Sequence, residues 1–221
     1  MSRSATVETT KPLSVQLYDE LRRRIMLGTY PQGTPLYEQR MAADLNVSRI
    51  PVREAMPLLQ YEGFIETTPR RTAVVATWTE QRIHDLFDTR LGLEVAAAGA
   101  AARRVRAGGT LSELEAAVVR AERQLQEGDA LLQAEANGAI HLALVAAAEN
   151  ELMDSLMRAV GGRMTWLFYL TSSRDLTVQG QEHAAILDAL RSGNERLAES
   201  LTFAHIEAGR TPSLAAVRPP G

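Results

Sequence analysis

The chain has 221 residues and no cysteine, which excludes disulfide bonds and thiolate metal sites. It is 45% hydrophobic and 23% charged, as is usual for a globular protein, and it is long enough for two domains. No apolar run approaches the ~18 residues that a transmembrane helix needs, and the first residues lack an apolar secretory segment. We therefore expect a cytoplasmic protein with no membrane partner.

The formal net charge of −3 is distributed unevenly along the chain. Residues 1–77 carry ten Lys and Arg against eight Asp and Glu, whereas residues 78–221 carry 14 against 19. The first part is therefore basic by two charges and the second acidic by five. A basic part can bind nucleic acid, while an acidic part limits non-specific attachment.

Residues 11–77 are predicted to form one module, after a loose tail at residues 1–10. A first helix with one apolar side ends near Gly28. A second helix is predicted over Leu36–Leu45, and Asn46 follows it at a tight turn that needs a residue tolerant of positive φ. A third helix follows directly, so the order is helix, turn, helix.

This third helix has the pattern of a DNA recognition helix. Ser48 can cap it, and Pro51 lies in its first turn, where a missing N–H costs little. Arg49 and Arg53 share one face, and their planar donor groups match a phosphate or the O6/N7 edge of guanine. The alternative is a merely solvated charged face. The opposite, apolar stripe consists of Val52, Ala55, Met56 and Leu59.

A basic hairpin is predicted after the recognition helix. Gly63 ends the helix, and two strands are predicted at residues 64–68 and 73–76 around a turn at residues 69–72. A hairpin with Arg70 and Arg71 at its tip is typical of a wing. Pro57 lies beyond the first turn of the recognition helix, where proline ordinarily costs about 3 kcal/mol unless the helix bends.

From about Thr79 onward the sequence is rich in Ala, Leu, Arg and Glu and shows no strand pattern. Short segments with glycine, asparagine or serine, which end helices, divide residues 78–211 into six predicted helices. A loose proline-containing tail is predicted at residues 212–221. The fold class is therefore mainly α, with a winged helix-turn-helix and a small β-hairpin wing before an all-α bundle. The helices are predicted near residues 79–105, 111–126, 129–148, 151–170, 177–191 and 194–209.

Three of the four histidines, His141, His183 and His205, lie on three different helices of this bundle. Asn137 precedes His141 by four residues, so both side chains project from one helix face and could converge on one ion. Imidazole is the commonest protein ligand for zinc and also suits nickel, iron and copper. Scattered histidines are more often surface or core residues, so the residues alone leave both interpretations open.

Residues 13–76 resemble the winged helix-turn-helix domain of the GntR family of bacterial transcription regulators. The resemblance rests on residues 17–25, Gly33 before Leu36, Arg40, residues 47–55 and residues 62–65. The chain departs from the family at Asn46, Ile50 and Thr72. The resemblance implies two groups of DNA-contacting residues. The first would contact the DNA backbone and bases and consists of Arg40, Ser48, Arg49, Pro51 and Arg53. The second would reach the minor groove and consists of Arg70, Arg71 and Thr72.

The second half resembles the helical, effector-binding FCD domain of the FadR subfamily, in its shorter six-helix, VanR-like form. The resemblance rests on residues 137–144, 147–150, 183–190 and 203–206. In that family an Asp and three His bind a divalent metal, which implies that Asn137, His141, His183 and His205 hold an ion here, zinc or nickel foremost. Asn137 replaces the usual Asp, so it offers an amide oxygen but no negative charge.

The same resemblance places Arg90 in the pocket, where it would bind the carboxylate of an effector with two parallel hydrogen bonds. The alternative is an intrahelical pair of Arg90 with Glu94, worth only about 0.2–0.5 kcal/mol. Both interpretations stay open at this point.

We therefore expect a ligand-responsive transcription regulator that binds a pseudo-palindromic operator as a homodimer. A small carboxylate effector at the metal site would change its affinity for DNA. Two alternatives remain: a regulator whose histidines bind an organic acid without metal, and a metalloenzyme with three histidines and a water. No recognisable motif supplies a general base for the enzyme.

Overall fold

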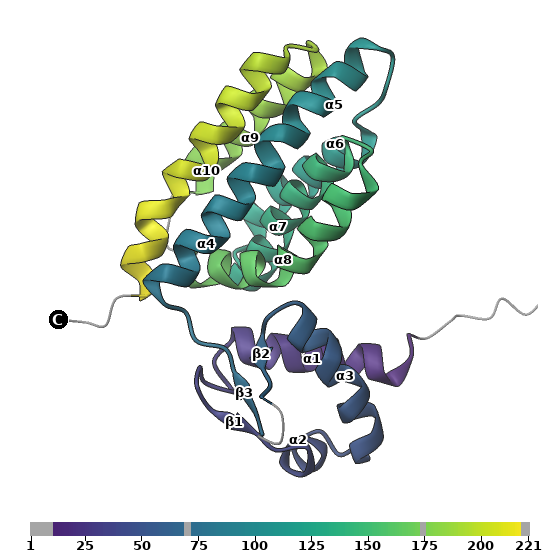
Figure 1. The fold of residues 1–221 in the computed structure, drawn as a ribbon, viewed down its shortest axis with the longest axis vertical. Coiled ribbons are helices and arrows are strands. Elements are labelled where there is room, and N and C mark those ends of the chain that lie inside the picture. Colours follow the sequence, from purple (N-terminus) through teal and green to yellow (C-terminus); the bar gives the residue numbers. More distant parts are fainter. Residues whose placement is uncertain (1–10, 69–71, 173–175, 218–221) are drawn as a thin grey trace, which may run out of the picture. The chain divides into compact units, whose positions relative to one another are not determined.

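The computed structural model describes residues 11–68, 72–172 and 176–217. The chain divides into two compact units, Met1–Thr77 and Trp78–Gly221 (Figure 1). Each unit is described by itself. The tail predicted at residues 1–10 lies outside the described residues.

The first unit combines three helices with a small antiparallel sheet (Figure 1). The sheet has the order β1-β3-β2, with Pro35 opposite Val74 and Ile65 opposite Val75. The predicted wing hairpin is therefore present, as β2 and β3. The elements are α1 (Leu13–Met26), β1 (Pro35–Leu36), α2 (Glu38–Asp44), α3 (Arg49–Tyr61), β2 (Ile65–Glu66) and β3 (Ala73–Val75).

Two predictions about the helix-turn-helix need correction. Leu36, predicted as helical, lies in β1 opposite Ala73, because the buried strand pairing starts before α2 begins at Glu38. Ser48 stands at the start of α3, but its side chain makes no capping hydrogen bond. The prediction for Asn46 is confirmed, since its φ of 53° lies in the left-handed region.

The core of the first unit forms between α3 and α1. Val52, Ala55 and Leu59 of α3 are fully buried, as the predicted apolar stripe requires, and Leu21 and Ile25 provide the buried face of α1. Pro57 is exposed on the opposite side of α3, and the helix runs through it to Tyr61. The recognition helix is thus held by its apolar face and leaves its polar face open.

The second unit is an all-helical bundle, as predicted (Figure 1). The first predicted helix is continuous in backbone but contains a π-helical turn, η1. Helix α7 packs between α6 and α8, and α10 packs on α9, α5 and α4. The elements are α4 (Glu80–Arg90), η1 (Leu91–Val95), α5 (Ala96–Arg106), α6 (Ser112–Glu127), α7 (Ala130–Ala146), α8 (Glu151–Leu170), α9 (Leu176–Arg191) and α10 (Glu195–Val217).

The last helix is longer than predicted. A loose tail was expected from residue 212, yet α10 continues through Pro212 to Val217. Leu214 and Val217 pack against the cluster around Ile83 and Phe87, and this apolar contact holds the helix beyond the proline. Residues 218–221 lie outside the described residues.

None of the helices in the described parts of the chain is long and apolar enough to span a lipid bilayer.

Candidate functional site

Three imidazole rings meet inside the second unit. His141 comes from α7, His183 from α9 and His205 from α10, and all three are buried. One ring nitrogen of each lies within 4.8 Å of the other two. The Nε2 atoms of His183 and His205 are 3.1 Å apart. The structure therefore brings together three residues that lie far apart in the sequence, as predicted.

Two of these rings are hydrogen-bonded to carboxylates through Nδ1. Glu94 of η1 is fully buried, and its Oε2 lies 2.6 Å from Nδ1 of His141. Glu182 Oε2 lies 2.7 Å from Nδ1 of His205. A neutral imidazole that donates Nδ1–H to a carboxylate keeps the lone pair on Nε2 for another partner. This is the usual support of a metal-binding histidine.

Arg90 belongs to the same buried group and is only 2% exposed. Its Nε donates to Glu94 Oε1 at 2.7 Å, and its Nη2 lies 3.1 Å from Nδ1 and 3.3 Å from Nε2 of His141. The guanidinium also lies over the ring of Phe168. The expected pairing of Arg90 with Glu94 is therefore present, and the same guanidinium also contacts one histidine of the cluster, His141.

The buried environment fixes the charge of these groups. Burial lowers the pKa of His141 to about 4, although Glu94 opposes this shift. Burial also lowers the pKa of His183, with a further contribution from His205. Burial alone would raise the pKa of Glu94, but Arg90 and His141 outweigh it and lower that pKa overall. At neutral pH His141 and His183 are thus neutral, the form in which an imidazole binds metal, and they lie beside an ionised carboxylate.

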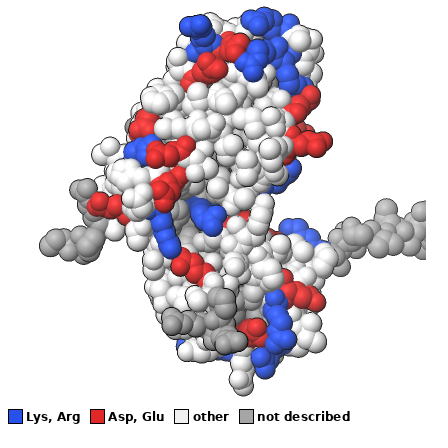
Figure 2. Space-filling view, in the orientation of Figure 1, with Lys and Arg blue, Asp and Glu red and all other residues white. Residues whose placement is uncertain are grey.

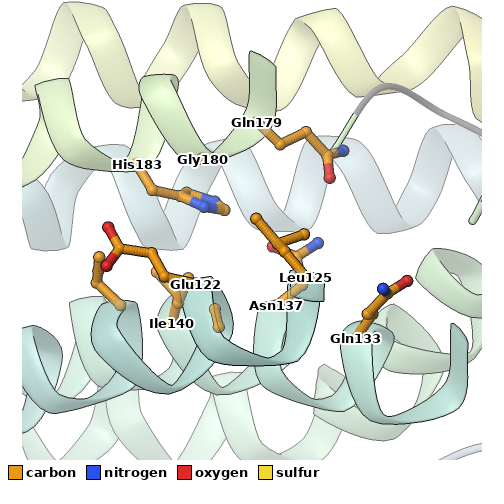
Figure 3. A pocket seen from close by; sticks show the side chains of 10 residues that line it. Glu122, Leu125, Gln133, Asn137, Ile140, Gln179, Gly180 and His183 are labelled. Carbon is orange, nitrogen blue, oxygen red and sulfur yellow. The ribbon is translucent and has the colours of Figure 1, made fainter. Parts of the chain in front are cut away.

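Asn137 lies on α7, one turn before His141, and lines a cavity together with His183 (Figure 3). Its Oδ1 is buried and has no hydrogen-bond partner among the described residues. An unsatisfied buried polar atom costs about 1–3 kcal/mol, so this oxygen is available to a group bound in the cavity. Three imidazoles and one unpaired amide oxygen are a donor set that fits a divalent ion.

Three cavities adjoin at this site. The inner one is lined by the three histidines, Glu94, Thr202 and apolar side chains. The outer one lies between α6, α7 and α9, and it shares His183 and Ile140 with the inner one (Figure 3). A third cavity, which reaches Phe168, shares three side-chain amides with the outer one. These amides are Gln133, Asn137 and Gln179.

Three contributors to the site were not predicted as such: Glu94 as the partner of His141, Glu182 and Thr202. Glu182 precedes His183 in the sequence but contacts His205, because consecutive side chains of a helix diverge and α9 packs on α10. The spacing of Arg90 and Glu94 was visible, but nothing in it indicated burial or the π-helical turn.

The predicted DNA-contacting residues lie on the first unit. Arg49 Nη2 and Arg53 Nη2 lie 3.3 Å and 3.0 Å from the same Oε2 of Glu38, and both arginines are exposed. Figure 2 shows acidic side chains beside basic ones on this unit. Of the other predicted contacts, Arg40, Ser48 and Thr72 are exposed, Pro51 is buried, and Arg70 and Arg71 lie outside the described residues.

A winged helix-turn-helix followed by a helical bundle is the architecture of a DNA-binding transcription regulator, and here the bundle holds a buried histidine cluster. Comparison with known families agrees. The family model described as "Bacterial regulatory proteins, gntR family" matches residues 13–75, and the FCD domain model matches residues 85–208. The chain therefore belongs to the GntR family of DNA-binding transcription regulators and carries the FCD domain of the FadR subfamily.

Individual relatives are regulators too. The chain is 29% identical over 201 residues to a protein of Paenarthrobacter nicotinovorans named "Probable D-xylose utilization operon transcriptional repressor", covering 90% of this chain and 88% of that one. It is 45% identical to the gluconate operon transcriptional repressor of Bacillus subtilis (strain 168), but over only 36% of this chain and 32% of the relative.

Among solved structures, a GntR transcriptional regulator from Rhodococcus sp. RHA1 is similar, with a TM-score of 0.77 and 27% identity. The similarity covers 93% of this chain and 99% of that one. The family is one of transcription regulators and not of enzymes, so the metalloenzyme alternative is set aside.

Proposed function

We propose that this protein is a cytoplasmic, homodimeric transcription regulator whose affinity for a pseudo-palindromic operator is set by a divalent metal ion and a small carboxylate effector. The observation that carries the proposal is the buried cluster of His141, His183 and His205 beside the unsatisfied Oδ1 of Asn137.

DNA binding begins with the release of two arginines. Arg49 and Arg53 are held by Glu38 in exposed ion pairs, which are worth at most about 1 kcal/mol. Phosphates or guanine edges replace Glu38 at little cost and gain bidentate hydrogen bonds. The proposed contact surface comprises Arg40, Ser48, Arg49, Arg53, Arg70, Arg71 and Thr72, whereas Pro51 is buried and its place in the first turn of α3 gives it a structural role.

The proposed ion, zinc or nickel, is held by the three imidazoles and by Asn137 Oδ1. Bound there, it supplies a positive centre that attracts an oxygen anion. Glu94 and Glu182 accept the Nδ1–H of His141 and His205, and so they orient these rings. Arg90 adds a guanidinium beside His141 for the carboxylate of the effector.

The effector reaches the histidines through the outer cavity between α6, α7 and α9 (Figure 3). This cavity offers side-chain amides from Gln133, Asn137 and Gln179, and the carboxylate of Glu122 lines it as well. The amides donate to and accept from polar groups, and Glu122 repels a second carboxylate. The favoured effector is therefore a monocarboxylate with an uncharged polar tail.

A second candidate is a regulator of the same class in which the histidines bind an organic acid without metal. One observation favours it: the guanidinium of Arg90 lies against the ring of His141, with Nη2 3.1 Å from Nδ1 and 3.3 Å from Nε2, so a cationic group already stands beside the nitrogen that an ion would need.

Metal analysis of the purified chain separates the two candidates. We expect about one zinc or nickel per chain in the wild type, and none in His141→Ala or His205→Ala. His84→Ala is the control, because this histidine lies outside the cluster. Operator binding, followed by fluorescence anisotropy, should change when a chelator removes the metal. A metal-free wild type that still responds to carboxylates would support the second candidate.

A further inference from the structure

Thr202 of α10 is a fully buried polar residue whose hydroxyl is unpaired. Its exposed fraction is 0%, and its Oγ1 has no hydrogen-bond partner within the described parts of the chain. Buried hydroxyls on helices commonly bond a backbone carbonyl one turn earlier. Ser213 on the same helix does so, donating to the carbonyl oxygen of Gly209 at 2.8 Å. The hydroxyl of Thr202 is left available instead.

The position of Thr202 shows which residues surround it. Thr202 lies three residues before His205, on the same face of α10. It lines the inner cavity together with His141, His183 and His205. The remaining walls are mainly apolar, formed by Leu114, Leu144, Ile186 and Leu187.

The polar groups around the inner cavity are already paired with one another, except Thr202. Nδ1 of His141 and of His205 face Glu94 and Glu182, and Nε2 of His205 lies 3.1 Å from Nε2 of His183. The hydroxyl of Thr202 adds an O–H donor to the same space. Hydrogen bonds from a hydroxyl to an ionised oxygen are short and strong, particularly in an apolar cavity.

We propose that Thr202 is a ligand-binding residue, which donates a hydrogen bond from Oγ1 to an oxygen atom of a carboxylate bound at the histidine cluster. The carboxylate end of the ligand then lies inward at Thr202, and its substituent points outward to the amide-lined cavity. This inference rests on the proposed carboxylate site.

In the unliganded protein the buried, unpaired hydroxyl of Thr202 lowers the free energy of unfolding. Replacing an unsatisfied buried hydroxyl by a methyl group of the same shape is neutral or stabilising, whereas removing a hydroxyl that has a partner destabilises. Thr202→Val should therefore weaken the binding of a carboxylate without lowering the stability of the empty protein. A purely structural threonine would show the reverse.

The experiment uses acetate as the probe and the full-length protein, both zinc-loaded and chelator-treated. Calorimetry measures acetate affinity, and thermal unfolding without acetate measures stability. We expect Thr202→Val to weaken acetate binding about tenfold or more, since a hydrogen bond to a charged group is worth about 1.5–3 kcal/mol. Thr202→Ser, which keeps the hydroxyl, should stay within about threefold of the wild type. Zinc stoichiometry should not change.

Ser213→Ala is the matched control, because it removes a buried hydroxyl from the same helix outside the cavity. It should lower the unfolding temperature and leave acetate affinity unchanged. Equal acetate affinity in the wild type and Thr202→Val, or a loss in Thr202→Ser as large as in Thr202→Val, would overturn the role of Thr202. A wild type that binds no acetate in either form would instead refute the carboxylate site itself.

Discussion

Replacing Arg90 by methionine tests the buried ion pair at the centre of the site. The side chains of Arg90 and Glu94 are 3% and 0% exposed, and their Nε and Oε1 atoms are 2.7 Å apart. Methionine keeps much of the volume but leaves Glu94 charged and without its cation. Breaking a buried pair in this way typically costs about 3–5 kcal/mol.

The remaining contacts of Glu94 place the expected loss at the lower end of that range. Oε2 keeps its hydrogen bond from Nδ1 of His141, so only one of the two carboxylate oxygens loses its partner. We expect Arg90→Met to lower the free energy of unfolding by about 3 kcal/mol. For a chain of this size that corresponds to a fall of roughly 6–12 °C in unfolding temperature.

Urea unfolding, followed by circular dichroism and by the fluorescence of buried Trp166, measures this loss. Arg158→Met is the matched control: Arg158 pairs with Asp154 at the same spacing of four residues, but its side chain is 66% exposed. The control should lose less than about 1 kcal/mol.

Two results would refute the reasoning about the buried pair. One is a loss in Arg90→Met no larger than in the exposed control. The other is a double variant, Arg90→Met with Glu94→Met, that is less stable than Arg90→Met alone. Removing both charges leaves no unpaired ion in the interior, so the double variant should recover part of the stability.

Three further predictions concern other parts of the chain. Gly138→Ala should lower the free energy of unfolding, measured with urea, by about 1–3 kcal/mol, because the new Cβ would lie 2.5 Å from Oγ1 of Thr165. The control Gly92→Ala should not destabilise the protein, since no atom lies within 4 Å of the new Cβ. Equal effects of the two variants would contradict this packing argument. Glu38→Gln should raise the affinity for random-sequence DNA about two- to fivefold in anisotropy titrations, because it removes the ion pairs that hold Arg49 and Arg53. An unchanged affinity would show that these ion pairs do not compete with DNA. Asn46→Ala should cost about 1–2 kcal/mol in thermal unfolding because φ is 53° there, while Asn46→Gly should not.

The DNA-binding unit was largely predictable because its signals are local. The apolar stripe of α3, the turn at Asn46 and the hairpin strands each follow from residues within one or two turns of one another. The strand β1 was not predictable from such signals, since two residues are too few to show an alternating pattern. The missing cap at Ser48 shows that a suitable residue at the right position does not guarantee the hydrogen bond.

The histidine site was predictable only through the family resemblance. Spacing put Asn137 and His141 on one helix face, but it could not bring α7, α9 and α10 together. The partners of the histidines depend on that packing. The pair of Arg90 with Glu94 was expected, at most, as a weak surface contact. Because both side chains are buried, breaking the pair costs more free energy of unfolding than breaking an exposed pair. The end of α10 was also set by tertiary contact, since Pro212 alone indicated a break.

Asn137 has a consequence for the electrical balance of the proposed site. Arg90 and Glu94 neutralise each other, and Glu182 contributes one negative charge. With a divalent ion and four uncharged ligands the group would therefore carry one positive charge in excess. One monocarboxylate brings it to neutrality, whereas an aspartate at position 137 would already have done so. The amide of Asn137 thus leaves the site one anion short, and Asn137→Asp should bind metal more tightly while losing affinity for acetate.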